Sequence, residues 1–152
     1  MTEPSSLVDL LPHQPPMRLI ESVIELVPGA LARTARVARV DDWFVQGHFP
    51  GDPVVPAIIC IELIAQTGGL AACAPAGASA SGALATTSPA ASPSLRVAAV
   101  GHFKFPAAAR PPVRLETTAR VVLRMGNMIR IEGEVTADGV RVASGQITLA
   151  GG

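Results

Sequence analysis

The sequence predicts an α+β domain in which a curved antiparallel sheet wraps around one long apolar helix. Residues 56–73 are apolar on nearly every side of a helix, which is typical of a helix inside a protein. The segments before and after it alternate apolar and polar residues and are separated by turn residues, as half-buried antiparallel strands are. Because each such strand must bury one face, the strands and the helix are expected to share one core.

The length and composition fit a single domain over residues 1–152. The chain has 152 residues, of which 49% are hydrophobic, and this supports one core without room for a second. Lys+Arg and Asp+Glu are equal at 12 each, so no net field attracts nucleic acid or an anionic membrane, and we expect no nucleic-acid partner. The first residues lack a basic region followed by an apolar run, so we expect no secretion signal and a cytoplasmic location.

Two strands are predicted before the helix and several after it. Residues 18–26 and 30–40 alternate around the turn Val27-Pro28-Gly29. Another strand is expected after residue 94. The last third of the chain alternates strongly, and the turns Gly126-Asn127 and Asp138-Gly139 divide it into a meander of three strands, 113–124, 129–136 and 140–149.

The helix is expected to start near Pro56 and to bury a carboxyl group. Proline suits the first helical position because its missing N–H would have no intrahelical partner there. Glu62 and Gln66 are four residues apart and share a face. A buried carboxylate without a partner costs several kcal/mol or takes up a proton, so a carboxyl group at Glu62 indicates either a buried partner or a function. These polar groups and two glycines also predict that the helix does not span a membrane.

The helix is followed by a segment that cannot bury much. Residues 74–94 are almost wholly Ala, Ser, Gly, Pro and Thr, which predicts a flexible loop within the domain. Cys60 and Cys73 lie more than three turns apart on one helix, so they cannot form a disulfide and are expected to be buried thiols. The pair Gly68-Gly69 is expected to allow close packing against another chain or strand.

A tight loop before the helix predicts an acid/base site. Residues 47–56 contain two glycines and three prolines, which hold a chain in one path, and they would hold His48 rigidly. The helix start that follows presents free N–H groups and a partial positive charge to a carbonyl oxygen that gains negative charge. The alternatives are that His48 is a structural loop histidine and that Glu62 pairs with Arg18 or Arg36.

Three motifs resemble those of the beta-hydroxyacyl-acyl carrier protein dehydratases of bacterial fatty acid synthesis. They are Leu11-Pro-His-Gln-Pro-Pro-Met17, the stretch Phe44–Pro56 with His-Phe-Pro-Gly-Asp-Pro-Val-Val-Pro, and Glu62-Leu-Ile-Ala-Gln66. A looser likeness continues through 99–106 and the strands after it. The most specific feature is the spacing of fourteen positions between His48 and Glu62.

The resemblance implies a hotdog fold and a (3R)-hydroxyacyl-[acyl carrier protein] dehydratase that produces a trans-2-enoyl thioester without a cofactor. In the family, the histidine that matches His48 removes the C2 proton, and the acid that matches Glu62 protonates the departing 3-hydroxyl. The backbone N–H of Ala57 would polarise the thioester carbonyl, and Gly47, Val55 and Gln66 would support the site. The family also implies a homodimer with composite sites, which can assemble further into a trimer of dimers, and an acyl carrier protein as partner.

The sequence departs from the family at some of these positions. Val55 and Ala57 stand where methionine and glycine are usual, and the absence of tyrosine excludes a tyrosine gate for the acyl tunnel. Docking of an acidic carrier protein needs basic residues near the tunnel mouth. The candidates are Arg96, Lys104, Arg110 and Arg114, with ordinary solvated charges as the alternative.

The same residues leave two other functions open. A hotdog thioesterase would use the carboxylate to activate water, but hydrolysis has no need of the histidine. A non-catalytic hotdog would bind acyl chains or complete a heterodimer. The three histidines are scattered, so no metal site is expected, and neither a Gly-x-Ser-x-Gly elbow nor a phosphate-binding glycine motif is present.

Overall fold

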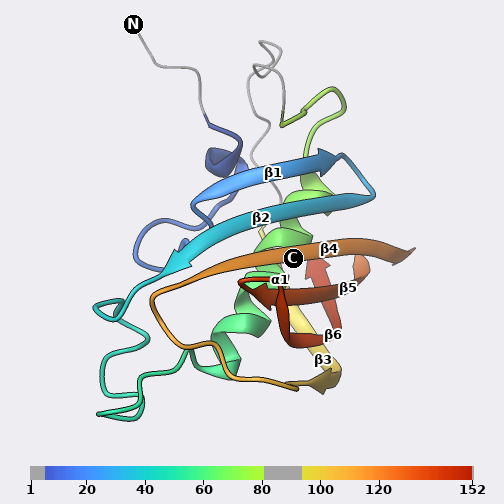
Figure 1. Ribbon diagram of the computed structural model, residues 1–152. Coiled ribbons are helices and arrows are strands. Elements are labelled where there is room, and N and C mark those ends of the chain that lie inside the picture. The colour runs from blue at the N-terminus through green and yellow to red at the C-terminus, as the bar shows by residue number, and fades with distance from the viewer. Residues whose placement is uncertain (1–5, 81–93, 152) are drawn as a thin grey trace, which may run out of the picture.

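The computed structural model describes residues 6–80 and 94–151, and its elements follow the predicted order (Figure 1). In chain order they are the 3-10 helix η1 (Leu7–Leu10), β1 (Ser22–Val27), β2 (Leu31–Ala38), α1 (Ala57–Cys73), β3 (Leu95–Lys104), β4 (Val113–Met125), β5 (Met128–Ala137) and β6 (Val140–Gly151). Of the predicted loop 74–94, residues 74–80 form neither helix nor strand, and residues 81–93 lie outside the described part of the chain.

The strands form one antiparallel sheet that curves around α1, as Figure 1 shows. The order is β1-β2-β4-β5-β6-β3, so the first and third strands in sequence are the two edges. The meander β4-β5-β6 is continuous, with Leu115 opposite Ala137 and Ile131 opposite Ile147. The predicted α+β architecture of a curved sheet around one helix is therefore confirmed.

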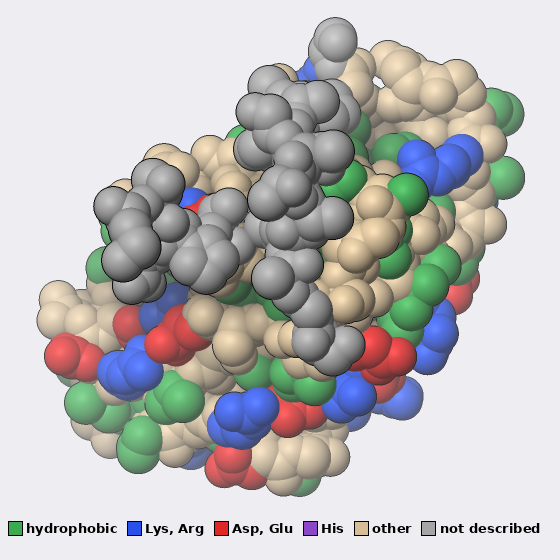
Figure 2. Space-filling model, turned by 90° about the horizontal axis from the view of Figure 1, so that it is seen from above, with side chains coloured by type: hydrophobic (Ala, Val, Ile, Leu, Met, Phe, Trp, Pro, Cys, Tyr) green, Lys and Arg blue, Asp and Glu red, His purple; other side chains and the backbone are tan. Residues whose placement is uncertain are grey.

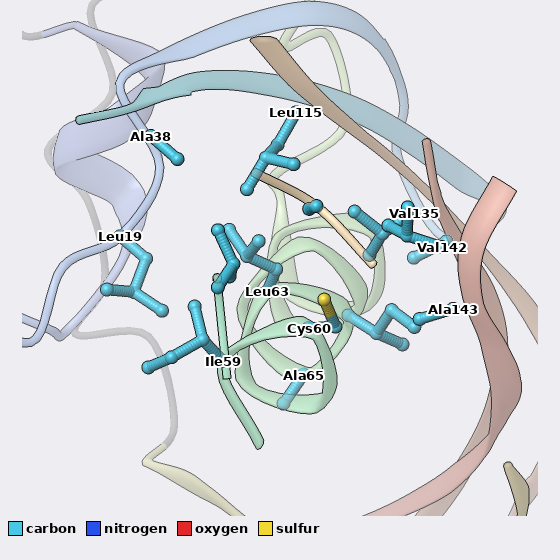
Figure 3. Packing of buried hydrophobic residues seen from close by; sticks show 14 of the residues in the cluster. Leu19, Ala38, Ile59, Cys60, Leu63, Ala65, Leu115, Val135, Val142 and Ala143 are labelled. Atoms are coloured by element: carbon cyan, nitrogen blue, oxygen red, sulfur yellow. The ribbon is translucent and has the colours of Figure 1, made fainter. Parts of the chain in front are cut away.

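The helix is central because it is apolar on most sides. Side chains from α1, such as Ile59 and Leu63, converge with Leu115 and Val135 of the sheet in Figure 3. Pro56 is the residue just before the helix rather than its first residue. The helix ends at Cys73, where the N–H of Ala74 donates to the Leu70 carbonyl and Pro75 follows.

Glycines set the distance between the helix and the sheet. A Cβ at Gly68 would lie 2.8 Å from Cγ2 of Ile131 on β5, and a Cβ at Gly133 would overlap the side chain of Ile64. Real Cβ atoms do not approach other carbons so closely. The prediction that the Gly68-Gly69 pair allows close packing is confirmed for Gly68 against a strand.

The N-terminal segment packs on the last turns of α1. Val8 and Leu11 form a second apolar cluster with Leu70 and Ala71 of the helix and with residues of β1 and β2. Strand β1 begins at Ser22 and not at residue 18, because the backbone of residues 17–19 is hydrogen-bonded to the α1 side chain Gln66 instead of to a strand.

Candidate active site

His48 lies in a loop that the backbone holds in a tight path. Gly47 and Gly51 have positive φ values of 78° and 91°, which glycine adopts without strain. Phe49 has a φ of 64°, and its ring lies 4.3 Å from the ring of His48 between centroids. The N–H of Val55 donates to the carbonyl of Ala109, and this bond joins the end of the loop to the segment before β4. Gly47 and Val55 thus lie on either side of the histidine in this loop.

One hydrogen bond fixes the tautomer of His48. Its Nδ1 lies 3.0 Å from the carbonyl oxygen of Val54. A carbonyl oxygen only accepts hydrogen bonds, so Nδ1 carries the proton in this contact. The lone pair of the neutral ring is then on Nε2. This is the arrangement that a general base needs.

The N–H of Ala57 is available at the start of α1. It has no acceptor within residues 6–80 and 94–151, because it belongs to the first turn, whose N–H groups have no intrahelical partner. No side chain caps this helix end, and Ala57 itself is exposed. The position is therefore open to an oxygen that gains negative charge.

Glu62 is held by Gln66. The Nε2 of Gln66 donates to Oε1 of Glu62 at 2.9 Å and to the carbonyl of Met17 at 2.7 Å, and its Oε1 accepts the N–H of Leu19 at 3.0 Å. The amide is fully buried, so these bonds leave its orientation no freedom. Gln66 thus fixes one oxygen of the carboxylate and ties the segment 17–19 to the helix.

Glu62 is less buried than its position in an apolar helix predicts. Its side chain is 28% exposed, so the prediction of a buried carboxyl is wrong for the single chain. The reason is a cavity of about 280 Å³ into which the residue faces, between α1, β3 and the N-terminal segment. The alternative in which Glu62 pairs with Arg18 or Arg36 is also wrong, because Arg18 pairs with Asp9 and Arg36 with Asp42.

The structure adds a residue that sequence reasoning did not connect to Glu62. Nε2 of His13 lies 3.6 Å from Oε1 of Glu62, and both residues line the same cavity. His13 lies in the Leu11–Met17 motif, and this motif is the sequence feature that could have pointed to His13 as a site residue. Its position beside α1 depends on the long-range bonds of Gln66, which periodicity does not reveal.

His48 and Glu62 do not share a cavity within one chain. The 280 Å³ cavity is lined by Glu62 and not by His48. A second cavity of about 230 Å³ lies beside Ala57 and is lined by Val54, the residue that anchors His48, but not by Glu62. The helix explains this separation, since five residues turn a helix by roughly 140° and place Ala57 and Glu62 on different sides.

The four basic candidates for carrier docking are not one patch. Arg96 and Lys104 stand near opposite ends of β3, roughly 25 Å apart at the usual rise of a strand. Arg110 binds Asp52, and Arg114 binds Glu116. On the face drawn in Figure 2, basic and acidic side chains are interspersed. Only Arg96 lines the cavity of Glu62, so it is the candidate best placed at a site.

Residues 6–80 and 94–151 contain no group of three His, Cys, Asp or Glu side chains arranged to hold a metal ion. Within the same residues, no helix has the length and apolar character needed to cross a membrane. Cys60 is buried, and desolvation raises the pKa of its thiol to about 11. Cys73, which was expected to be buried, is only half-buried because it lines the cavity of Glu62.

Comparison with known proteins identifies the class. A family model described as the FabA-like domain matches residues 11–146, which include every candidate site residue. The chain belongs to the FabA-like domain family.

Particular relatives narrow this class. The chain is 31% identical over 143 residues to the 3-hydroxyacyl-[acyl-carrier-protein] dehydratase FabZ of Myxococcus xanthus, covering 92% of this chain and 85% of that protein. It is 27% identical over 144 residues to the FabZ dehydratase of Oleidesulfovibrio alaskensis, and this match covers 95% of this chain and 87% of that protein. A shorter match to the FabZ dehydratase of Ligilactobacillus salivarius is 39% identical over 71 residues and covers 47% of this chain and 51% of that protein.

Solved structures show the same fold. The dehydratase heterocomplex ApeI:P from Xenorhabdus doucetiae aligns with a TM-score of 0.69 at 18% identity, covering 100% of this chain and 93% of that chain. The HP0420 homologue from Helicobacter felis aligns with a TM-score of 0.66 at 13% identity, with the same coverage. The expected hotdog fold is confirmed.

Proposed function

We propose that this chain is a (3R)-hydroxyacyl-[acyl carrier protein] dehydratase, in which His48 is the general base and Glu62 the general acid. The observation that carries the proposal is the contact of His48 Nδ1 with the Val54 carbonyl, because it leaves Nε2 free to act as a base in the loop that leads into the uncapped start of α1. The full-length FabZ relatives support the reaction and the fatty acid pathway.

The reaction follows from these groups. Nε2 of His48 takes the C2 proton while the thioester oxygen, which gains negative charge, accepts the N–H of Ala57. The C3–O bond breaks as the Glu62 carboxyl gives its proton to the leaving hydroxyl, so the products are the trans-2-enoyl thioester and water. Each positioned acid or base contributes roughly 10²–10⁴-fold to such a rate. No cofactor takes part, since the reaction moves only protons and water.

We also propose that each active site is completed by a second copy of the chain. Two features support a dimer in which β3 pairs with its partner. Strand β3 is an edge of the sheet with exposed apolar residues, such as Val100 at 52%, and Ile58 near the start of α1 is 71% exposed. An edge strand presents unpaired backbone groups to a second strand. Pairing would place Glu62 of one chain opposite His48 of the other, which one chain alone does not achieve.

The central experiment tests both proposals at once. The variants His48→Ala and Glu62→Gln are each expected to lose enoyl-thioester hydration, measured by the fall in ultraviolet absorbance, and to keep their fold and dimeric state. Mixed after dissociation, the two variants form heterodimers with one intact site each. Random pairing then restores about a quarter of the wild-type activity. Full activity of both single variants would defeat the catalytic assignment, and a mixture that stays inactive would defeat the composite site.

A thioesterase is the rival enzyme, because the same carboxylate can activate water. The assay separates the two, since hydrolysis releases a free thiol and dehydratase chemistry does not. A protein that binds acyl thioesters and turns none over would be a non-catalytic hotdog.

The partner is proposed to be an acyl carrier protein, with Arg96 as its contact at the Glu62 cavity. Arg96→Glu is expected to raise KM for a carrier-bound substrate and to leave KM for a short synthetic thioester unchanged. Equal effects on the two substrates would remove Arg96 from carrier docking. The cytoplasmic location and the trimer of dimers stay predictions.

A further inference from the structure

A second histidine faces the proposed acid. Nε2 of His13 is 3.6 Å from Oε1 of Glu62, which is longer than a hydrogen bond and short enough for an ion pair when the imidazole is protonated. Nδ1 of His13 is buried and has no hydrogen-bond partner among residues 6–80 and 94–151, whereas Nδ1 of His48 is held by a carbonyl. Nε2 of His13 is the ring nitrogen that faces the carboxyl group, so it is the one placed to exchange a proton with Glu62.

The position of His13 is held from its backbone. Nε of Arg18 donates to the carbonyl oxygen of His13 at 3.0 Å, and Nη1 of the same arginine binds Oδ1 of Asp9 at 3.0 Å. Asp9 in turn accepts the N–H of Ser6. Since the charge of Arg18 is paired with Asp9, it holds the loop in place.

The other charged or titratable groups at the cavity do not suit proton transfer near neutral pH. Besides His13 and Glu62, the lining residues of this kind are Cys73 and Arg96. Desolvation raises the pKa of the Cys73 thiol, partly offset by Arg124, so the thiol keeps its proton. A guanidinium does not deprotonate in proteins. His13 is the remaining titratable group that lines the cavity beside Glu62.

The proposed reaction leaves a proton imbalance that such a group can correct. After dehydration, Glu62 has lost a proton and His48 has gained one, so the site must be reset before the next turnover. We propose that His13 acts through Glu62 as a positioning residue that returns the proton to its carboxylate. The step rests on the function proposed above. When the two side chains close from 3.6 Å to hydrogen-bond distance, the proton moves from Nε2 of His13 to the carboxylate of Glu62. Water then reprotonates His13 and His48 releases its proton to water, so the protons balance.

The test compares His13→Ala with a matched control in enoyl-thioester hydration, where the same transfer runs in reverse. The expected loss in kcat is at least about tenfold and smaller than the roughly 10²–10⁴-fold expected at Glu62 itself. The loss in kcat/KM is expected to be smaller than the loss in kcat, because the site regains its starting protonation state only after the chemical step, and kcat/KM does not report on that later step. Imidazole in the buffer restores kcat in proportion to its concentration. Pyrazole, a ring of the same size but a much weaker base, does not.

Gln14→Ala is the matched control, since Gln14 is the exposed neighbour of His13 and its side chain makes no hydrogen bond within the described residues. It is expected to behave as wild type. His13→Asn keeps a polar side chain and repeats the test if the alanine variant fails to fold. Wild-type kcat in either variant, or a loss that imidazole does not restore, overturns the role of His13. An inactive wild-type enzyme instead overturns the function on which the inference rests.

Discussion

Nε2 of Gln66 donates a hydrogen bond to Oε1 of Glu62 at 2.9 Å, one helical turn away on the same face of α1. The same amide binds the backbone of Met17 and Leu19. One buried side chain therefore orients the proposed acid and fixes the N-terminal segment that carries His13. Gln66 therefore contributes both to the fold of the N-terminal segment and to the geometry of the candidate site.

Replacing Gln66 is expected to damage stability and activity together. Gln66→Leu leaves the N–H of Leu19 and the carbonyl of Met17 without partners, which costs about 1–3 kcal/mol for each buried group that stays unpaired. Urea denaturation measures the loss of stability, and kcat in hydration falls because Glu62 loses its orienting donor.

Gln66→Glu separates the two effects. It keeps an oxygen that accepts the N–H of Leu19, but it removes the donor to Glu62 and places a second carboxyl one turn away, which is unfavourable when both are ionised. We therefore expect this variant to lose more activity than stability, as measured by kcat in hydration and by urea denaturation. A variant with wild-type stability and kcat would show that the hydrogen bonds of Gln66 are dispensable.

Local pattern was sufficient to predict the main elements. The helix was predicted because residues 56–73 are apolar almost all round, and the meander because the last third alternates with a period of two and has Gly126 and Asp138 at its turns. Periodicity and turn residues act over a few positions, so they are visible in one sequence. The family motif added His48 and Glu62 as candidates.

Long-range contacts were not visible in the sequence. The strand predicted over residues 18–26 includes Leu19, yet the N–H of Leu19 binds Gln66, which is 47 positions away. The exposure of Glu62 follows from a cavity that residues 10–13 of the N-terminal segment line together with α1 and β3. No local pattern reports how three distant segments meet, and His13 was missed for the same reason.

The adjacent glycines of α1 are expected to respond in opposite ways. Gly68→Ala forces a methyl group against Ile131 on β5, and such overpacking typically costs about 1–3 kcal/mol. Gly69→Ala meets nothing within 4 Å and removes a helix-breaking residue, so it is expected to stabilise the chain by about 0.5–1 kcal/mol. Thermal unfolding of the two variants checks the contrast.

Gly69→Ala should also change function. Gly69 lines the cavity of Glu62, so the added methyl reduces the space there. We expect a higher KM for acyl thioesters with an unchanged fold. Equal stability of both alanine variants would contradict the close approach of α1 to β5.

The ion pair between Arg110 and Asp52 is expected to make the loop that carries His48 sensitive to acid. The hydrogen bond from Arg110, together with its charge, lowers the pKa of Asp52 below the ordinary value. A lowered pKa in the folded state means that the pair stabilises the protein above the ordinary pKa of aspartate, about 4, and that this stability is lost as pH falls through the folded value. The pair is exposed, so its contribution is small.

Titration of the Asp52 carboxyl by NMR measures this effect. Arg110→Ala is expected to return the pKa of Asp52 toward its ordinary value. Arg114→Ala is the matched control, because Arg114 binds Glu116 instead of the loop, and it should leave Asp52 unchanged. An Asp52 pKa that does not respond to Arg110→Ala would show that the pair does not persist in solution.

The two cysteines are expected to differ in their reaction with alkylating agents. Only the thiolate reacts, and desolvation raises the pKa of Cys60 to about 11, so at pH 8 this buried thiol reacts only when the protein unfolds. Burial also raises the pKa of Cys73, with Arg124 opposing the shift, but Cys73 is half-buried and reachable through the cavity. Its alkylation rate should rise about tenfold per pH unit below its pKa. Mass spectrometry of the labelled peptides distinguishes the two sites.

A substrate analogue and one variant sharpen this test. An acyl thioester analogue that fills the cavity of Glu62 is expected to protect Cys73 and to leave Cys60 unaffected. Arg124→Met removes the opposing charge, so the pKa of Cys73 rises further and its labelling at a fixed pH becomes slower. Arg120→Met on the same strand is the control and should not alter the rate. Labelling of Cys60 in the folded protein at the rate of an exposed thiol would contradict its burial between α1 and the sheet, and with it the packing on which both cavities depend.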